Sequence, residues 1–483
     1  MAILCIDAGT TLIKSVLFDD NGKELIVASR ATHVLNPSPE LSEQDMNEVW
    51  QSVVDTCKEI LTRTELPIDA ISVTAQGDGA WMIDANGSPV RNAVLWNDGR
   101  ASAEIDEWAK AGVLEKAYEI NGSLTSLGLP NAIIKWFAKN DPETLEKTTA
   151  VLTCGSWIYY KLTGLVGQHI SEASAPWIDI TSKTVSKELI ELYGLTAYES
   201  KIPPVLTDTK ATLSATELGI ATTTPVVMAP YDILATATGS GAIEDGEAFV
   251  ILGTTTCPGI VIREIDLLGE AAGLNLATGE DGKYLRALPT LTGTNALTWA
   301  MENLNYSNVD EIGTAAAGAN PGADGVILLP YFSGAGERAP FLDSRARASF
   351  HGITSNSSRE DLARAVYEAL AHVIRECLET TKTPVKLLAI SGGGARSDFW
   401  CQLIADVVGV PTSRTSDTQV GAKGALMYAS VAIGKHSSLT NAAKDLVSQS
   451  DTFTPNAQLH DFYTTQHKEF VSLRKAIQPR WAH

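Results

Sequence analysis

The sequence has few cysteines, and none of them is spaced as a metal-binding or redox pair. Six cysteines are scattered over 483 residues, no two form C-x-x-C, and the eight histidines show no metal-ligand spacing. These absences argue against a zinc site. The apolar surroundings of the cysteines predict small buried residues in a reducing cytosol.

Long hydrophobic runs and a basic leader are also missing. No apolar run approaches the roughly 20 residues of a membrane span. The first residues, Met1 to Asp7, lack a basic segment followed by a cleavable apolar stretch. These absences predict a cytoplasmic protein with no membrane partner.

Basic residues are outnumbered. There are 37 Lys and Arg against 57 Asp and Glu, which gives a formal net charge of −20. An acidic surface argues against nucleic acid and anionic membranes as partners. It still permits an anionic ligand, because a local nest of backbone N–H groups binds phosphate whatever the total charge.

Two familiar nucleotide motifs are absent as well. The chain contains no G-x-x-x-x-G-K-[ST] loop, and its glycine-rich stretch, residues 391–397, lacks the G-x-G-x-x-G spacing of a dinucleotide fingerprint. A nucleotide site in this protein would therefore be of another kind.

What is present indicates an α/β fold in two domains. A chain of 483 residues is too long for one ordinary core. Strand-like runs at Ala2–Ile6, Lys14–Phe18 and Glu24–Ser29 predict a β-meander, and the periodicity of Asp45–Leu61 predicts a helix. Ser358 with Asp361 resembles a capping box at the start of another helix. Alternating strands and helices favour the α/β class.

One short sequence pattern occurs twice in the chain. A strand runs into Asp7-Ala8-Gly9-Thr10-Thr11, and the apolar run Ala248–Leu252 runs into Gly253-Thr254-Thr255-Thr256. The repetition of a strand followed by a Gly/Thr turn predicts two related halves. We place their boundary near residues 240–247.

Both Gly/Thr turns are candidate phosphate loops. Glycine lets a phosphate approach the backbone and threonine adds hydroxyl donors. Asp7 beside the first turn could hold Mg²⁺, which prefers oxygen ligands and keeps several waters. The alternative for each is an ordinary tight turn, with Asp7 as its cap.

A third junction is Ser391-Gly392-Gly393-Gly394-Ala395-Arg396-Ser397, which follows a strand and precedes a helix. Its consecutive glycines would permit a flat ring to pack against the backbone. The alternative is a glycine-rich connector.

Three polar side chains follow other strands. Asp232 comes after the strand that ends at Pro230, and Gln76 and Asp78 follow the buried strand Ala70–Thr74. Each could contact a substrate, and each could equally cap a turn or tie down a loop.

Taken in order, these junctions resemble the FGGY family of carbohydrate kinases over essentially the whole chain. The family's second signature is present in Ser349-Phe350-His351-Gly352-Ile353 with the run 361–368, and its first signature is degenerate around 133–137. The resemblance implies two ribonuclease-H-like (actin-like ATPase) domains flanking a catalytic cleft. They would be an N-terminal domain, 1–243, with the substrate site and the base, and a C-terminal domain, 244–483, with the nucleotide.

Within the family, the segments 74–81 and 334–341 are most similar to erythritol kinases, and Trp96-Asn97-Asp98-Gly99-Arg100 is shared with xylulose kinases. Glycerol kinases carry Arg-Glu where this chain has Gly77-Asp78, so the arginine that contacts glycerol there is missing. Ser156 stands where many members have an Asp, which puts one local contact in doubt.

The resemblance implies an ATP- and Mg²⁺-dependent kinase that phosphorylates a hydroxyl of a small sugar or polyol. Asp232 would be the general base. Asp7, and Asp232 through water, would hold the metal. The implied ATP-binding residues are Thr10, Thr11, Gly253, Thr254, Thr255, Gly393, Gly394 and Ala395. The implied substrate-binding residues are Asp78, Gln76, Trp81, Asp232 and Trp177, the last also readable as a core tryptophan.

Two other functions stay open from the sequence. One is an actin-like ATPase that acts as a chaperone, filament or regulator. The other is a non-catalytic sugar-binding protein. The substrate is open among tetritols, pentitols and ketopentoses, and the resemblance allows a homodimer.

Overall fold

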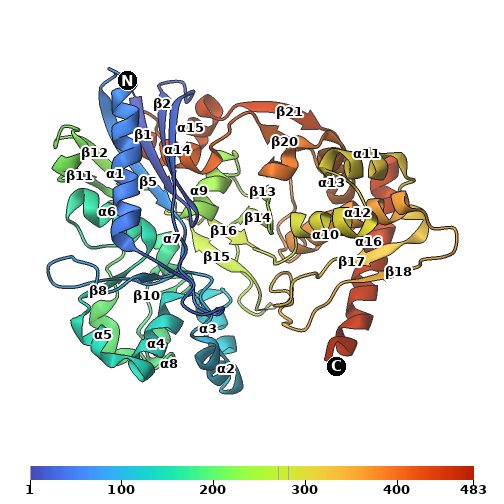
Figure 1. The fold of residues 1–483 in the computed structure, drawn as a ribbon, viewed down its shortest axis with the longest axis horizontal. Coiled ribbons are helices and arrows are strands. Elements are labelled where there is room, and N and C mark those ends of the chain that lie inside the picture. The colour runs from blue at the N-terminus through green and yellow to red at the C-terminus, as the bar shows by residue number, and fades with distance from the viewer. Residues whose placement is uncertain (1, 270, 281, 483) are drawn as a thin grey trace.

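The computed structural model describes residues 2–269, 271–280 and 282–482. It contains two large mixed sheets, one in each half of the chain, which lie side by side in Figure 1 with helices around them. Within the described residues, no helix is long and apolar enough to cross a membrane. All six cysteines are free and buried, as predicted.

The first sheet has six strands in the order β11–β12–β5–β1–β2–β3. β1 pairs antiparallel with β2 and parallel with β5, so the predicted meander forms the start of the sheet. β1 is apolar on both faces because helices cover both, as is usual for strands that pair in parallel. The bounds are β1 Ala2–Ala8, β2 Leu12–Asp19, β3 Glu24–Ala31, β5 Ile68–Ala75, β11 Lys210–Thr212 and β12 Pro225–Met228.

Helix α1 (Met46–Thr62) covers one face of this sheet and confirms the predicted helix. The Asp45 side chain caps it by accepting hydrogen bonds from Asn47 N and Glu48 N. Its buried residues Val49, Val53 and Ile60 recur at helical spacing and join the core beneath β2.

Short elements complete the first half. The paired strands are β4 Glu43–Gln44 with β7 Ala93–Val94, β6 Trp81–Ile83 with β8 Ala150–Leu152, and β9 Ile178–Asp179 with β10 Thr184–Val185. The helices are α2 Ser102–Lys110, α3 Val113–Asn121, α4 Pro130–Asn140, α5 Pro142–Lys147, α6 Cys154–Thr163, α7 Ile170–Ala173, α8 Lys187–Leu192, η1 Thr196–Lys201, η2 Thr216–Leu218 and α9 Asp232–Gly239.

The second sheet repeats the design of the first. Its order is β15–β16–β14–β13–β19–β20–β21, and β13 pairs antiparallel with β14 and parallel with β19, as β1 does with β2 and β5. This repetition confirms the two related halves that the Gly/Thr echo predicted. The bounds are β13 Glu247–Leu252, β14 Thr256–Ile262, β15 Leu274–Ala277, β16 Tyr284–Ala287, β19 Leu387–Ser391, β20 Thr412–Thr415 and β21 Gln449–Phe453.

Helices flank the second sheet. The predicted capping box is present at the start of α12, where Ser358 and Asp361 exchange hydrogen bonds. The other elements of this half are α10 Thr294–Leu304, α11 Val309–Gly318, η3 Ala323–Gly325, β17 Ile327–Leu329, β18 Ser349–His351, α12 Arg359–Leu378, η4 Gly393–Arg396, α13 Asp398–Val408, α14 Val420–Ala432, α15 Leu439–Leu446, α16 Ala457–Ile477 and η5 Gln478–Ala482.

Helices α14 and α15 belong to the second half by sequence but pack on the first sheet. Ala422, Ala425 and Leu426 share a core cluster with Ile3 and Cys5 of β1. α14 also crosses α9 at close range, because a Cβ at Gly424 would lie 1.9 Å from the Ala235 carbonyl oxygen. The strands divide at the predicted boundary between 243 and 244, whereas the helices do not, so the domain limits stay a prediction.

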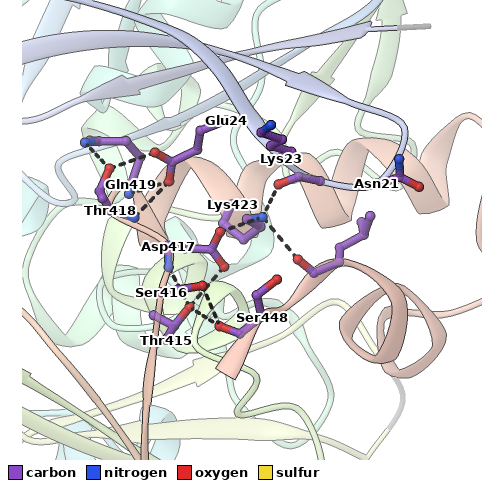
Figure 2. A network of polar contacts seen from close by, with 12 residues as sticks. Asn21, Lys23, Glu24, Thr415, Ser416, Asp417, Thr418, Gln419, Lys423 and Ser448 are labelled. Carbon is purple, nitrogen blue, oxygen red and sulfur yellow. Dashed lines mark hydrogen bonds and ion pairs between the residues drawn. The ribbon is translucent and has the colours of Figure 1, made fainter. Parts of the chain in front are cut away.

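A polar network fixes the N-terminal end of α14 to the β2–β3 hairpin (Figure 2). Glu24 Oε1 accepts from the backbone N–H groups of Thr418 and Gln419, both at 2.9 Å, and so caps a helix that lacks a side-chain cap of its own. The buried Lys423 ammonium pairs with Asp417 Oδ1 at 2.9 Å and donates to the carbonyls of Gly22 and Leu446.

We expect Lys423→Met to lower the free energy of unfolding by about 3–5 kcal/mol, because it leaves the buried Asp417 carboxylate without its cation. Lys435→Met is the matched control: Lys435 pairs with the half-exposed Asp20, and the expected loss is about 0–1 kcal/mol. Urea denaturation measures both. Equal losses in the two variants would show that the network in Figure 2 contributes no more to the free energy of unfolding than a surface ion pair does.

Candidate active site

Strand ends from both sheets meet at a cavity of about 280 Å³, here called the inner cavity. Its walls include Thr10, Gln76, Asp78 and Asp232 from the first half and Thr255 from the second. The parallel strands β1, β5 and β12 place the turns that follow them at one edge of the first sheet. Five of the residues predicted for the site are thus brought together.

A second, larger cavity of about 920 Å³, the outer cavity, lies in the C-terminal half. It is lined by Gly253 and Thr254, by Gly393 and Gly394 of η4, and by one face of α11. Thr254 faces the outer cavity and Thr255 the inner one, so the Gly253–Thr255 turn forms the wall where the two cavities meet.

Asp232 is the first residue of α9, directly after the turn that follows β12. Burial raises the pKa of its carboxyl group to about 7, and the negative charges of Asp7 and Asp78 add to the effect, opposed by the Ile233 backbone N–H. A carboxylate with this pKa is a much better proton acceptor at neutral pH than an ordinary aspartate.

Asp78 lies between two glycines and also lines the inner cavity, with a left-handed backbone at φ 57°. Gly77 is required here because a Cβ would lie 2.4 Å from the Tyr231 ring. Burial raises the pKa of Asp78 to about 7, while the nearby Arg338 cation lowers it and Glu172 raises it. Asp78 is therefore a strong hydrogen-bond acceptor facing the inner cavity.

Gln76 is tied to other side chains. Its Nε2 donates to Gln44 Oε1 at 2.8 Å, and its Oε1 accepts from the Thr10 hydroxyl at 2.8 Å. Trp96 Nε1 in turn donates to Thr10 Oγ1 at 3.1 Å. This chain of hydrogen bonds holds Thr10 and Trp96 in place, so Gln76 organises the cavity wall.

The structure does not bring the two predicted tryptophans to the inner cavity. Trp81 is 1% exposed in β6 and Trp177 is 2% exposed, and both belong to hydrophobic core clusters. Trp96, which the sequence analysis gave no role, lines the cavity instead and is 37% exposed. Its indole is the one positioned to cover the apolar face of a ligand.

Four predicted nucleotide residues do not line the outer cavity: Thr10 and Thr255, which line the inner one, and Thr11 and Ala395. Thr11 is exposed at the tip of the first turn. Ala395 faces a separate cavity of about 590 Å³ on the other side of η4, which Gly393 also lines. Residues of α11, among them Gly313 and Ala317, line the outer cavity and were not predicted, because nothing in their local sequence marks them.

Asp7 and Asp232 offer carboxylate oxygens, the ligand type that Mg²⁺ prefers, close enough for the charge of Asp7 to act on Asp232. Burial raises the pKa of Asp7, and the charge of Asp7 raises that of Asp232, so the two carboxylates repel each other. Within the described residues, no hydrogen bond or ion pair satisfies the Asp7 carboxylate. No cluster of three or more His, Cys, Asp or Glu side chains is present there. Water would have to complete the coordination, as is usual for Mg²⁺.

Comparison with known proteins identifies the family. Residues 2–239 match the model of the FGGY family of carbohydrate kinases, N-terminal domain, and residues 248–433 match the C-terminal domain of the same family. A probable L-xylulose kinase of Haemophilus influenzae is 25% identical over 98% of this chain and 99% of its own length. An erythritol kinase of Brucella abortus is 27% identical, covering 99% of this chain and 97% of its own.

Solved structures share the fold. A ligand-bound xylulose kinase from Lactobacillus acidophilus superposes with a TM-score of 0.93 at 22% identity, over 99% of this chain and 98% of its own. Plasmodium falciparum glycerol kinase with ADP gives a TM-score of 0.88 at 19% identity, over 98% and 97%. With both halves matched by family models, the chain belongs to the FGGY family of carbohydrate kinases.

Proposed function

We propose that the inner cavity holds a tetritol, pentitol or ketopentose and that the protein transfers the γ-phosphoryl group of ATP to one of its hydroxyls. The observation that carries the proposal is the meeting of two cavities at one phosphate-loop turn. Asp232 and Asp78 line the first cavity, Gly393 and Gly394 the second, and Gly253–Thr255 separates them.

Asp232 acts as the general base in this proposal. It takes the proton of the attacking hydroxyl while that oxygen attacks the phosphorus atom, and ADP leaves. Phosphoryl transfer depends mainly on alignment and on neutralising charge. Thr255 lines the same cavity as Asp232 and supplies a hydroxyl donor for the phosphoryl oxygens, whereas the hydroxyl hydrogen of Thr10, in the same wall, is donated to Gln76.

Asp7, with Asp232 through water, would hold Mg²⁺, which neutralises phosphate charge when it is bound. The adenine and ribose would occupy the outer cavity between η4 and α11. There the absence of side chains at Gly393 and Gly394 leaves the backbone accessible to a flat ring. Asp78 would accept hydrogen bonds from sugar hydroxyls and Trp96 would cover the sugar's C–H face.

Relatives named as kinases of xylulose and erythritol, matched over nearly their whole length, favour this function over an actin-like ATPase or a silent sugar-binding protein. The test is ADP release with Mg·ATP and a panel of tetritols, pentitols and ketopentoses. Sharp stimulation by one acceptor supports the proposal. A basal ATPase rate that no acceptor raises would favour the actin-like alternative.

The pH profile gives a quantitative check. The base must be deprotonated, so kcat/KM is expected to fall as pH drops through about 7, the pKa of Asp232, and to level off at higher pH. Steady-state rates between pH 5 and 9 measure this limb. A limb near pH 4, the ordinary range of an aspartate, would contradict the buried base.

A further inference from the structure

One arginine from the C-terminal half reaches the inner cavity. Arg338 lies in the segment between β17 and β18, and it lines the cavity together with Asp78 and Asp232 of the N-terminal half. It is the one Lys or Arg side chain among the described residues that line this cavity. The sequence motif around it, Gly334–Phe341, has no role in the mechanism above.

The backbone of Arg338 is firmly held. The neighbouring Glu337 is 1% exposed, and its Oε1 accepts hydrogen bonds from Leu291 N at 2.6 Å and from Arg338 N at 2.9 Å. Glu337 also exchanges backbone hydrogen bonds with Asp343 at 3.0 and 2.9 Å. These hydrogen bonds fix the position of the Arg338 backbone.

Only part of the hydrogen-bonding capacity of the guanidinium group is taken up by protein acceptors. Nε donates to the Pro289 carbonyl at 2.8 Å, and Cζ lies 5.9 Å from the centroid of the Trp96 ring. Across the described residues, no carboxylate pairs with Arg338 within 4.0 Å, and no hydrogen bond is made by Nη1 or Nη2. A guanidinium has five N–H donors, so the four on Nη1 and Nη2 have no protein acceptor.

Arg338 lies on the Asp78 side of the cavity. Its charge lowers the pKa of Asp78 and of Cys257, but it is not among the groups that set the pKa of Asp232. The arginine is therefore close enough to Asp78 for its positive charge to act on that carboxyl group.

We propose that Arg338 binds the acceptor sugar, donating hydrogen bonds from its terminal amino groups to sugar oxygens in the inner cavity. The inference rests on the proposed function, because it takes the inner cavity as the acceptor site. The sugar then bridges the two halves of the chain, held by Asp78 of one and Arg338 of the other. Sugar binding would draw the halves together and make ATP turnover depend on the acceptor.

Arg338→Met is expected to raise the KM for the acceptor by about 10- to 100-fold, the effect of losing hydrogen bonds to a charged group. The KM for ATP should not change. Arg338→Lys keeps the charge but loses the planar fork, so its acceptor KM should lie between the two. Arg345→Met is the matched control, because Arg345 lies in the same segment, 57% exposed, bonded to Asp343.

The pH profile separates a binding role from a structural one. Two charged groups act on Asp78: Arg338 lowers its pKa and Glu172 raises it. The charge of Asp78 in turn raises the pKa of Asp232 and of Tyr231. Removing the cation raises the pKa of Asp78. Asp78 must be ionised to accept from the sugar, so its pKa contributes to the acid limb of kcat/KM beside that of Asp232. The limb should therefore extend to higher pH in Arg338→Met and stay in place in Arg338→Lys and Arg345→Met.

The outcomes are distinguishable. An active wild-type enzyme whose acceptor KM and acid limb are the same in Arg338→Met overturns this inference and leaves the proposed function standing. A rise in the KM for ATP alone also overturns it, since Arg338 would then contact the nucleotide. A wild-type protein that phosphorylates no acceptor overturns the proposed function, and this inference with it. If Arg338→Met melts early, Arg338→Lys decides: a wild-type acceptor KM there overturns the inference.

Discussion

Asp232→Asn is expected to lower kcat by about 100- to 10,000-fold, the usual contribution of a positioned general base. The amide keeps the size of the side chain but cannot take the proton of the attacking hydroxyl. ADP release under saturating ATP and acceptor measures the loss. Asp55→Asn in α1, where the Asp55 carboxylate accepts a hydrogen bond from Gln51 Nε2 at 2.8 Å, is the control and should keep wild-type kcat.

The same variant should be more stable than the wild type at pH 8. The pKa of Asp232 is raised in the folded state, so its contribution to stability is present below the unfolded pKa of about 3.8 and lost as pH rises through about 7. The neutral amide does not suffer this loss. The melting temperature should therefore be higher in Asp232→Asn at pH 8, and the difference should shrink toward pH 5. A variant that keeps wild-type kcat, or melts lower at pH 8, would refute Asp232 as a buried base.

Gly393→Leu is expected to raise the KM for ATP by about 10- to 100-fold through steric filling of the nucleotide site. Gly393 lines the outer cavity, and a Cβ added there meets no atom within 4 Å. The leucine would thus occupy the space assigned to the adenine without disturbing the protein. The KM for the acceptor should not change. Initial rates at varied ATP measure the effect.

Gly318→Leu is the matched control for this variant. Gly318 is exposed at the end of α11, also has open space around its Cβ position, and does not line the outer cavity. It should bind ATP as the wild type does. If Gly393→Leu retains the wild-type KM for ATP, the nucleotide does not lie against Gly393, and the assignment of the adenine to the outer cavity is wrong.

Local patterns were enough to predict the strand-end turns. Asp7, Asp78 and Asp232 each follow a short apolar run that became a buried parallel strand, and parallel strands deliver their carboxyl ends to one edge. The helix caps at Asp45 and Ser358 are equally local, since each involves residues no more than three positions apart.

The choice of tryptophan could not be made in this way. Trp81 is buried because its short strand β6 pairs with β8, which begins at Ala150. Trp96 reaches the cavity through its hydrogen bond to Thr10. Both facts depend on contacts between residues far apart in the chain, and a single sequence does not show them.

The same limit applies to Arg338 and to α14. Arg338 enters a cavity whose walls come from both halves, and α14 covers the first sheet although 401 positions separate Lys423 from Gly22. The family resemblance supplied the two-domain fold. Only the structure showed that a side chain and a helix of the second half contact the first half.

In the proposed reaction, the γ-phosphoryl group of ATP passes to a sugar hydroxyl across the Gly253–Thr255 turn. The most direct measurement supplies ATP labelled at the γ-phosphate, with Mg²⁺ and the best acceptor, and asks where the label is recovered. We predict that it appears on the sugar, one phosphate for each ADP formed, and that Asp232→Asn nearly abolishes this product. Label recovered as inorganic phosphate, at a rate that the acceptor does not alter, would contradict the account.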